Sequence, residues 1–158
     1  MPSRALVVAM VAAALLVVSI GADALMNRTY VLEVQDGAGG WHVLARSQSS
    51  RGLAVPAGGF LVNATNGSVT FRLRETNTYL WPSSTPWEAR VEGASFAHGT
   101  LSSPARGEGE VTFGIPTSAW SASQPKPAEG APAGTLASVE VDVGDAPLYG
   151  GFQLAGGA

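Results

Sequence analysis

The stretch from Val69 to Trp120, VTFRLRETNTYLWPSSTPWEARVEGASFAHGTLSSPARGEGEVTFGIPTSAW, decides the fold, because short alternating runs and turn residues follow one another in it. Val69, Phe71 and Leu73 alternate with polar residues, as in a strand that has one buried face and one solvated face. Similar strands are expected at 87–91, 95–101 and 110–115. The stretch therefore predicts four strands of one β-sandwich.

The alternation continues on both sides of this stretch. Residues 29–35 and 41–45 flank the glycine-rich run 36–40, which predicts a hairpin. Residues 60–64 and 69–74 flank Asn66-Gly67, a pair that readily takes the two positive φ values of a type I′ hairpin turn. Further strands are expected at 138–143 and 152–154, beyond an exposed Pro-rich loop at 121–134. The fold class is therefore all-β, an immunoglobulin- or fibronectin-III-like antiparallel β-sandwich.

Composition limits the function. The chain has 158 residues, enough for one ordinary domain, and only 13% of them are charged. The net charge is −3 and Lys126 is the single lysine, so the chain offers no basic face to a phosphate backbone, and nucleic-acid binding is not expected. The absence of cysteine excludes disulfides, thiolate nucleophiles and Cys-ligated zinc.

A charge-free apolar run from Ala5 to Ala22 follows Arg4 near the amino terminus. As a helix it would be about 27 Å long, close to the hydrocarbon thickness of a bilayer, so residues 1–26 are expected to be a transmembrane anchor or a signal peptide. Arg4 places the amino terminus in the cytoplasm and the domain 27–158 outside the cell membrane. Retention and cleavage both stay open, because the run is longer than a typical signal segment, whereas Ala22-Asp23-Ala24 has signal-peptidase spacing and cleavage after Ala24 would release a secreted protein.

Two further patterns concern the cell surface. Arg4-Ala5-Leu6-Val7 resembles the cleavage region of archaeal type IV pilin precursors, although Ser3 stands where that family has a charged residue. Three N-x-S/T sequons begin at Asn27, Asn63 and Asn66, all on the predicted outer side. These asparagines are therefore candidate glycosylation sites.

Residues 69–120 also follow a recognisable order of motifs. A strand at 71–74 leads to Asn77, a Pro-rich bend runs from Trp81-Pro82 to Pro86, and a strand and Gly turn occupy 87–93. Gly99-Thr100-Leu101, Gly107-Glu108-Gly109 and an apolar strand at 111–115 come next, and Pro147-Leu148-Tyr149-Gly150 follows near the carboxy terminus. In this order the chain resembles the type 2 late embryogenesis abundant family, also called the water-stress and hypersensitive-response domain.

The resemblance implies a fibronectin-like sandwich without catalytic residues, often anchored in a membrane, with roles in stress protection and in binding. It also implies a strand break at Asn77 and Pro82. Thr78 departs from the family, which has proline after this asparagine, but an Asn side chain can still hydrogen-bond the backbone at a strand break. The predicted hairpin at 29–46 is not accounted for by the family.

No residue pattern points to catalysis, to a metal or to a cofactor. His42 and His98 lack a second histidine or a carboxylate at metal-ligand spacing, and both are expected to be solvent-facing strand residues. Glu108, expected in a turn, and Glu110, expected at the start of a strand, would form a catalytic pair only if their carboxylates converged. The sequence therefore predicts a protein that is not an enzyme.

Tryptophans supply the remaining candidates. Trp41 and Trp87 are expected in the core, whereas Trp81 and Trp120 lie beside loops, where they could stack on a glycan. The leading hypothesis is a non-enzymatic, membrane-anchored extracytoplasmic module, structural or stress-protective, whose partner is the bilayer through Ala5 to Ala22. The alternatives are a cell-surface assembly subunit, pilin-like or exchanging strand 136–143 with a neighbour, and a glycan-binding module.

Overall fold

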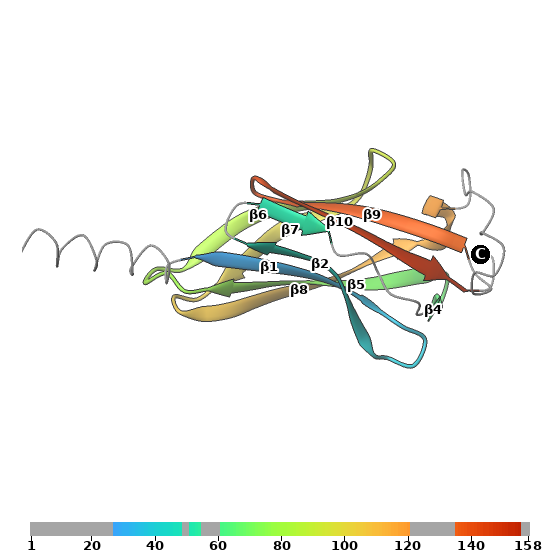
Figure 1. The fold of residues 1–158 in the computed structure, drawn as a ribbon, viewed down its shortest axis with the longest axis horizontal. Helices are drawn as coiled ribbons and strands as arrows, with labels where there is room; N and C mark the ends of the chain where they lie inside the picture. Colours follow the sequence, from blue (N-terminus) through green and yellow to red (C-terminus); the bar gives the residue numbers. More distant parts are fainter. Residues whose placement is uncertain (1–26, 49–50, 55–60, 121–134, 156–158) are drawn as a thin grey trace, which may run out of the picture.

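The computed structural model describes residues 27–48, 51–54, 61–120 and 135–155, and strands in these ranges form two β-sheets (Figure 1). The first sheet has the order β3-β2-β1-β5-β8, and the second has the order β4-β10-β9-β6-β7. The first sheet consists of β1 (Arg28–Gln35), β2 (Trp41–Gln48), β3 (Arg51–Ala54), β5 (Ser68–Asn77) and β8 (Gly107–Pro116). The second consists of β4 (Leu61–Val62), β6 (Ser83–Val91), β7 (Ala94–Ser103), β9 (Thr135–Val143) and β10 (Ala146–Leu154). A short 3-10 helix, η1 (Thr117–Trp120), follows β8, and the other regular elements of the described residues are all strands, as predicted.

The core lies between the two sheets. In β5 the odd-numbered residues from Val69 to Asn77 are buried, and the even-numbered ones are partly or fully exposed. Phe71 stacks on Phe113 of β8 and meets Phe152 of β10 edge to face, with ring centroids 5.4 and 5.8 Å apart. Burying one such side chain contributes about 1.5–3 kcal/mol. The alternation predicted for this strand therefore supplies the contacts that join the sheets.

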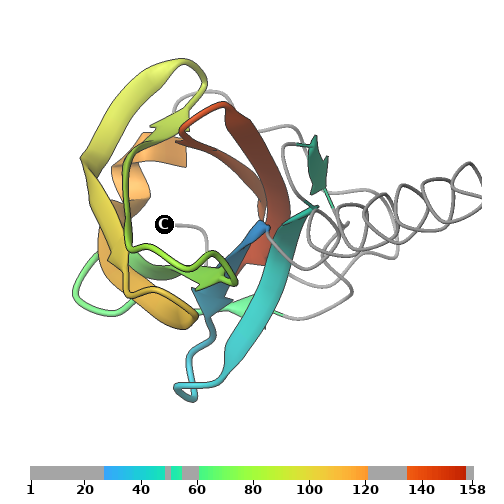
Figure 2. The same cartoon turned by 90° about the vertical axis from the view of Figure 1, so that its left-hand side faces the viewer.

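The sheets also approach each other at both edges (Figure 2). β8 of the first sheet lies beside β7 of the second, and β10 of the second lies against β2 and β3 of the first. Gly109 of β8 allows the first approach, because a Cβ there would overlap the carbonyl oxygen of Ser102. Gly150 of β10 allows the second, because a Cβ there would lie 2.6 Å from the Cβ of Leu44.

Two predicted hairpins are confirmed. β1 and β2 pair antiparallel on either side of residues 36–40, and β6 and β7 pair antiparallel around Glu92-Gly93. Glu92 and Gly93 have φ values of 51° and 83°, the left-handed pair that a tight hairpin turn requires.

The hairpin predicted around Asn66-Gly67 has the expected turn but the wrong partner. Asn66 and Gly67 have φ values of 53° and 74°, and Thr65 and Ser68 exchange backbone hydrogen bonds. The preceding strand is only the two-residue β4, however, and it pairs parallel with β10 of the second sheet rather than with β5. Val62 is fully buried there, so its contacts in the core outweigh a local pairing with β5.

Three other predicted boundaries move. β6 begins at Ser83, so Pro86 lies within a strand instead of a bend, and β8 begins at Gly107, so Glu108 lies in a strand instead of a turn. The pairing of β6 with β9 starts at Trp87, which leaves Pro86 outside that ladder. The last strand, predicted at 152–154, is the longer β10, which pairs with β9 from Ala146 to Leu154.

The strand considered for exchange between molecules, 136–143, lies inside its own sheet. β9 has β10 on one side and β6 on the other.

Asn27 is the first described residue, and β1 starts directly after it. Among the residues that the structure describes, no helix has the length and apolar character needed to cross a bilayer. The predicted membrane segment 5–22, the cleavage site after Ala24 and the Pro-rich loop 121–134 lie outside the described residues.

Candidate functional site

The end of the domain at which β1 begins holds a connected group of polar and aromatic residues. Asn77, the last residue of β5, is 1% exposed. Its Nδ2 donates to the carbonyl oxygens of Trp81 and Pro104 at 3.0 and 3.1 Å. Its Oδ1 accepts a hydrogen bond from the backbone N–H of Tyr79 at 3.0 Å. One side chain thus joins the loop between β5 and β6, residues 78–82, to the turn between β7 and β8.

The β5–β6 loop presents its apolar side chains outward. Leu80 and Trp81 are 53% and 51% exposed, and Pro82, directly before β6, is exposed as well. The rings of Tyr79 and Trp81 have centroids 5.2 Å apart, and the Arg28 guanidinium lies 4.7 Å from the centroid of the Tyr79 ring. The loop is therefore a group of apolar and aromatic side chains with a cation beside it.

Thr78 fastens the start of the described chain to this loop. Its backbone N–H donates to the carbonyl oxygen of Asn27 at 3.0 Å, and its Oγ1 accepts from the backbone N–H of Asn27 at 2.7 Å. The chain therefore enters the domain beside the exposed loop.

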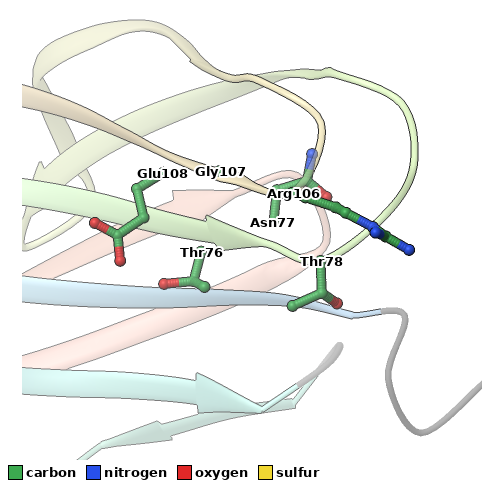
Figure 3. Close-up of a pocket in the computed structure, with 6 residues that line it drawn as sticks. All are labelled: Thr76, Asn77, Thr78, Arg106, Gly107 and Glu108. Carbon is green, nitrogen blue, oxygen red and sulfur yellow. The ribbon is translucent and has the colours of Figure 1, made fainter.

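A hollow of about 480 Å³ lies at the same end. Its lining consists of Thr76, Asn77, Thr78, Arg106, Gly107 and Glu108 (Figure 3). The side chains of Arg106 and Glu108 extend in opposite directions in Figure 3, so their charges do not meet at one point. The hollow is thus lined by one cationic and one anionic side chain, and these two side chains do not form an acid–base pair.

The core beside the break contains a carboxylate that sequence reasoning missed. Glu75 of β5 is fully buried, and its Oε1 accepts hydrogen bonds from the hydroxyls of Ser83 and Ser103. The two serine oxygens also lie 2.7 Å apart. A signal for this cluster was present, because Glu75 continues the inward register of Phe71 and Leu73.

Tyr30 of β1 belongs to the same cluster. Burial raises the pKa of its hydroxyl above the ordinary value of 10.0, the hydrogen bond with Thr85 opposes this shift, and the negative charge of Glu75 adds to it. The backbone N–H of Tyr30 donates to the buried Ser47 hydroxyl at 2.9 Å. The cluster therefore links strands of both sheets through polar groups.

A second buried carboxylate lies on the outer face of the first sheet. Glu33 of β1 is 4% exposed and accepts hydrogen bonds from Arg72 at 2.6 Å and from Arg74 at 3.1 Å. The Arg72 guanidinium also lies 4.3 Å from the Trp41 ring centroid. Sequence reasoning missed this group because β1 and β5 lie far apart in the chain, and their register brings Glu33 opposite Arg72.

The predicted binding and core tryptophans need two corrections. Trp120 is 4% exposed, its ring packs edge to face on Phe152, and its Nε1 donates to the carbonyl oxygen of Ser138 at 2.9 Å, so it is a core residue rather than a surface aromatic. Trp41 is only partly buried and lies with Arg72 outside the core, whereas Trp87 is in the core as expected.

The candidate glycosylation sites differ in accessibility. Asn63 and Asn66 are exposed, and Asn66 is part of the tight turn before β5. Asn27 is partly buried, and its backbone is bonded to Thr78.

Among the other titratable candidates, one histidine contacts a carboxylate. His42 contacts Asp36 at 2.7 Å, and this contact, together with the N–H groups of Gly40 and Ala38, lowers the pKa of Asp36. His98, Glu108 and Glu110 are exposed. Within the described ranges, no three His, Cys, Asp or Glu side chains are grouped closely enough to hold a metal ion.

No protein-family model matches this chain, and no curated protein matches it significantly.

Proposed function

We propose that the chain is a non-enzymatic β-sandwich module that one N-terminal helix, residues 5–22, holds at the outer face of a membrane. The observation that carries this proposal is the position of Asn27. The apolar run ends at Ala22, and five residues later Asn27 is bonded to Thr78 at one end of the two-sheet domain. The segment between the helix and the domain is thus too short to fold by itself. The domain therefore lies next to the membrane that holds the helix.

The proposal includes an immunoglobulin- or fibronectin-like fold. When β2, β3 and β4 are set aside, the remaining strand orders are β1-β5-β8 and β10-β9-β6-β7. In immunoglobulin notation β1, β5 and β8 correspond to strands A, B and E, and β10, β9 and β6 correspond to G, F and C. β7 is then the seventh strand, and it lies beside C rather than beside E. β2 and β3 are then an insertion after the first strand, in the segment that the family resemblance does not cover.

A structural or binding role is favoured because three buried polar side chains of the described residues make internal contacts. Glu33 is held by two arginines, Glu75 by two serines and Asn77 by three backbone groups. Such contacts stabilise one arrangement of strands and loops. The stress-protective part of the role is supported by the resemblance of residues 69–120 to the water-stress and hypersensitive-response domain.

The anchor is tested on the full chain expressed in cells. We expect it to stay in the membrane fraction during alkaline washing, and its intact mass should include residues 1–26. A Leu15→Arg substitution places a charge in the apolar run, at a cost of about 2.5–3.5 kcal/mol, and should weaken retention. Leu136→Arg is the matched control, because Leu136 is 51% exposed on β9 and its replacement should leave retention unchanged.

Two results would contradict the proposal. A mass that lacks residues 1–24 would show cleavage and a secreted protein, and release of the uncleaved chain by alkaline washing would exclude a spanning helix. The protective role is tested by drying and rehydrating vesicles. We expect those that carry the chain to leak less entrapped dye than vesicles with an unrelated anchored domain, and equal leakage would remove that role.

A further inference from the structure

The β5–β6 loop exposes two large apolar residues next to each other. Leu80 and Trp81 are 53% and 51% exposed. The other large apolar side chains that are exposed in the described ranges occur singly on four different strands of the second sheet. They are Leu61, Phe96, Leu136 and Tyr149. A contiguous exposed apolar patch of this kind is a candidate contact with a membrane or with another protein.

The outward position of these two residues is built into the loop. Asn77 accepts a hydrogen bond from the Tyr79 N–H and donates one to the Trp81 carbonyl, so it holds the loop backbone on either side of Leu80. The Tyr79 ring contacts Arg28 and Trp81 and is only partly exposed, whereas Leu80 is exposed. The Asn77 hydrogen bonds thus hold the part of the loop backbone that presents Leu80 to solvent.

The membrane is within reach of this loop. Asn27 follows Ala22 by five residues, and an extended chain covers at most about 3.6 Å per residue, or about 18 Å in all. Because Asn27 is bonded to Thr78, the loop that begins at Thr78 lies at the end of the domain that faces the anchor.

The chemistry of this end suits a phospholipid surface. Tryptophan and tyrosine concentrate at membrane interfaces, because their rings are apolar and their N–H and O–H groups bind water and headgroups. Arg28 and Arg106 lie at the same end and can meet lipid phosphates. Glu108 would repel them, but its side chain extends away from Arg106 (Figure 3).

We propose that the loop at residues 78–82 inserts Leu80 and Trp81 into the headgroup region of the bilayer that holds the anchor, with Arg28 and Arg106 beside lipid phosphates. This inference rests on the proposed function, since it requires a retained helix at 5–22. The helix and the loop together give two points of attachment. The domain is then held in one orientation, with the turns at 36–40 and 92–93 directed away from the membrane.

The test uses the absence of cysteine from the chain, because one introduced thiol can be labelled without ambiguity. Full-length Leu80→Cys carries an environment-sensitive fluorophore and is reconstituted into phosphatidylcholine vesicles with phosphatidylglycerol. Leu136→Cys is the matched control, since the two leucines are 53% and 51% exposed and Leu136 lies near the start of β9, at the other end of the domain. We expect the emission at position 80 to shift to shorter wavelength and to be quenched by lipids with a spin label near the headgroup, with neither effect at position 136.

The outcomes separate the two proposals. If the chain floats with the vesicles but the labels at 80 and 136 behave alike, the loop inference fails and the anchor stands. If the chain does not float, both fail. A loop that stays in water and binds a soluble glycan, with binding lost in Trp81→Ala, would assign it to glycans instead. As a second measurement, Trp81→Ser and Arg106→Gln in the Leu80→Cys background should each reduce quenching at position 80, and unchanged quenching in both would also overturn the inference.

Discussion

Asn77 and Glu75 occupy successive inward positions of β5, and their polar atoms stabilise different parts of the domain. Asn77 bonds only backbone groups, so it determines the path of the β5–β6 loop. Glu75 bonds serines of β6 and β7, so it ties the first sheet to the second. A buried polar group of either kind is costly without its partners, and these partners come from strands that are distant in the sequence.

Replacing Asn77 by alanine should destabilise the domain by about 2 kcal/mol, because two part-buried carbonyls and one part-buried N–H lose their partner. Urea denaturation of residues 27–158 measures the effect. Asn63→Ala is the control, since Asn63 is exposed and its loss should change stability by less than about 0.5 kcal/mol. Equal effects of the two substitutions would show that the Asn77 bonds do not support the loop.

Tyr30 makes stability depend on alkaline pH. Its pKa is raised in the folded state, chiefly by burial, so the folded state holds the proton more tightly than the unfolded state. The contribution is fully present below the ordinary value of 10.0 and is lost as pH rises from there through the folded pKa. The free energy of unfolding should therefore fall above pH 10, and it should fall less in Tyr30→Phe. Denaturation at a series of pH values checks this, and identical pH slopes would contradict it.

Strand-level features were predictable where the signal is local. The alternation of β5 and the turns at Glu92-Gly93 and Asn66-Gly67 depend on neighbouring residues, and the structure contains all three. The partner of β4 was not predictable, because the pairing with β10 joins residues about ninety positions apart. Of the candidate site, Asn77 and Trp81 could be found from turn and aromatic residues, whereas the Glu33–Arg72 pair depends on the register between β1 and β5.

The edge where β8 meets β7 provides a test at the level of one strand. An alanine at Gly109 would place its Cβ against the backbone of Ser102, whereas at Gly114 the nearest atoms are 3.8 Å away, an ordinary contact. Gly109→Ala should therefore lower the free energy of unfolding by about 1–3 kcal/mol, as overpacking does. Gly114→Ala should leave it nearly unchanged. Thermal unfolding of both variants of residues 27–158 measures the difference. If Gly109→Ala is tolerated as well as Gly114→Ala, the two strands are not in close contact.

The two sheets are held together by contacts between residues that lie far apart in the sequence. The aromatic group around Phe71 draws residues from β5, β8, η1 and β10, and these arise from both sides of the Pro-rich loop 121–134. Because β9 and β10 pack in the same core as β5 and β8, the described strands before and after residues 121–134 belong to one core. The alternating strand predicted at 138–143 needed a partner sheet, but the interior place of β9 in that sheet required the structure.

This arrangement predicts that residues 27–158 fold without the apolar run and remain monomeric. β9 has hydrogen-bonded neighbours on both sides, so exchanging it with another molecule would break two ladders and expose Val139, Val141 and Val143. We therefore expect a single cooperative unfolding transition with a β-type circular dichroism spectrum, and a monomer mass in sedimentation at all concentrations. Ending the chain at Gly144 removes β10 and should abolish the transition. Concentration-dependent dimers or filaments of residues 27–158 would instead favour the surface assembly subunit. They would show that exchange of β9 costs less free energy than the loss of its two ladders predicts.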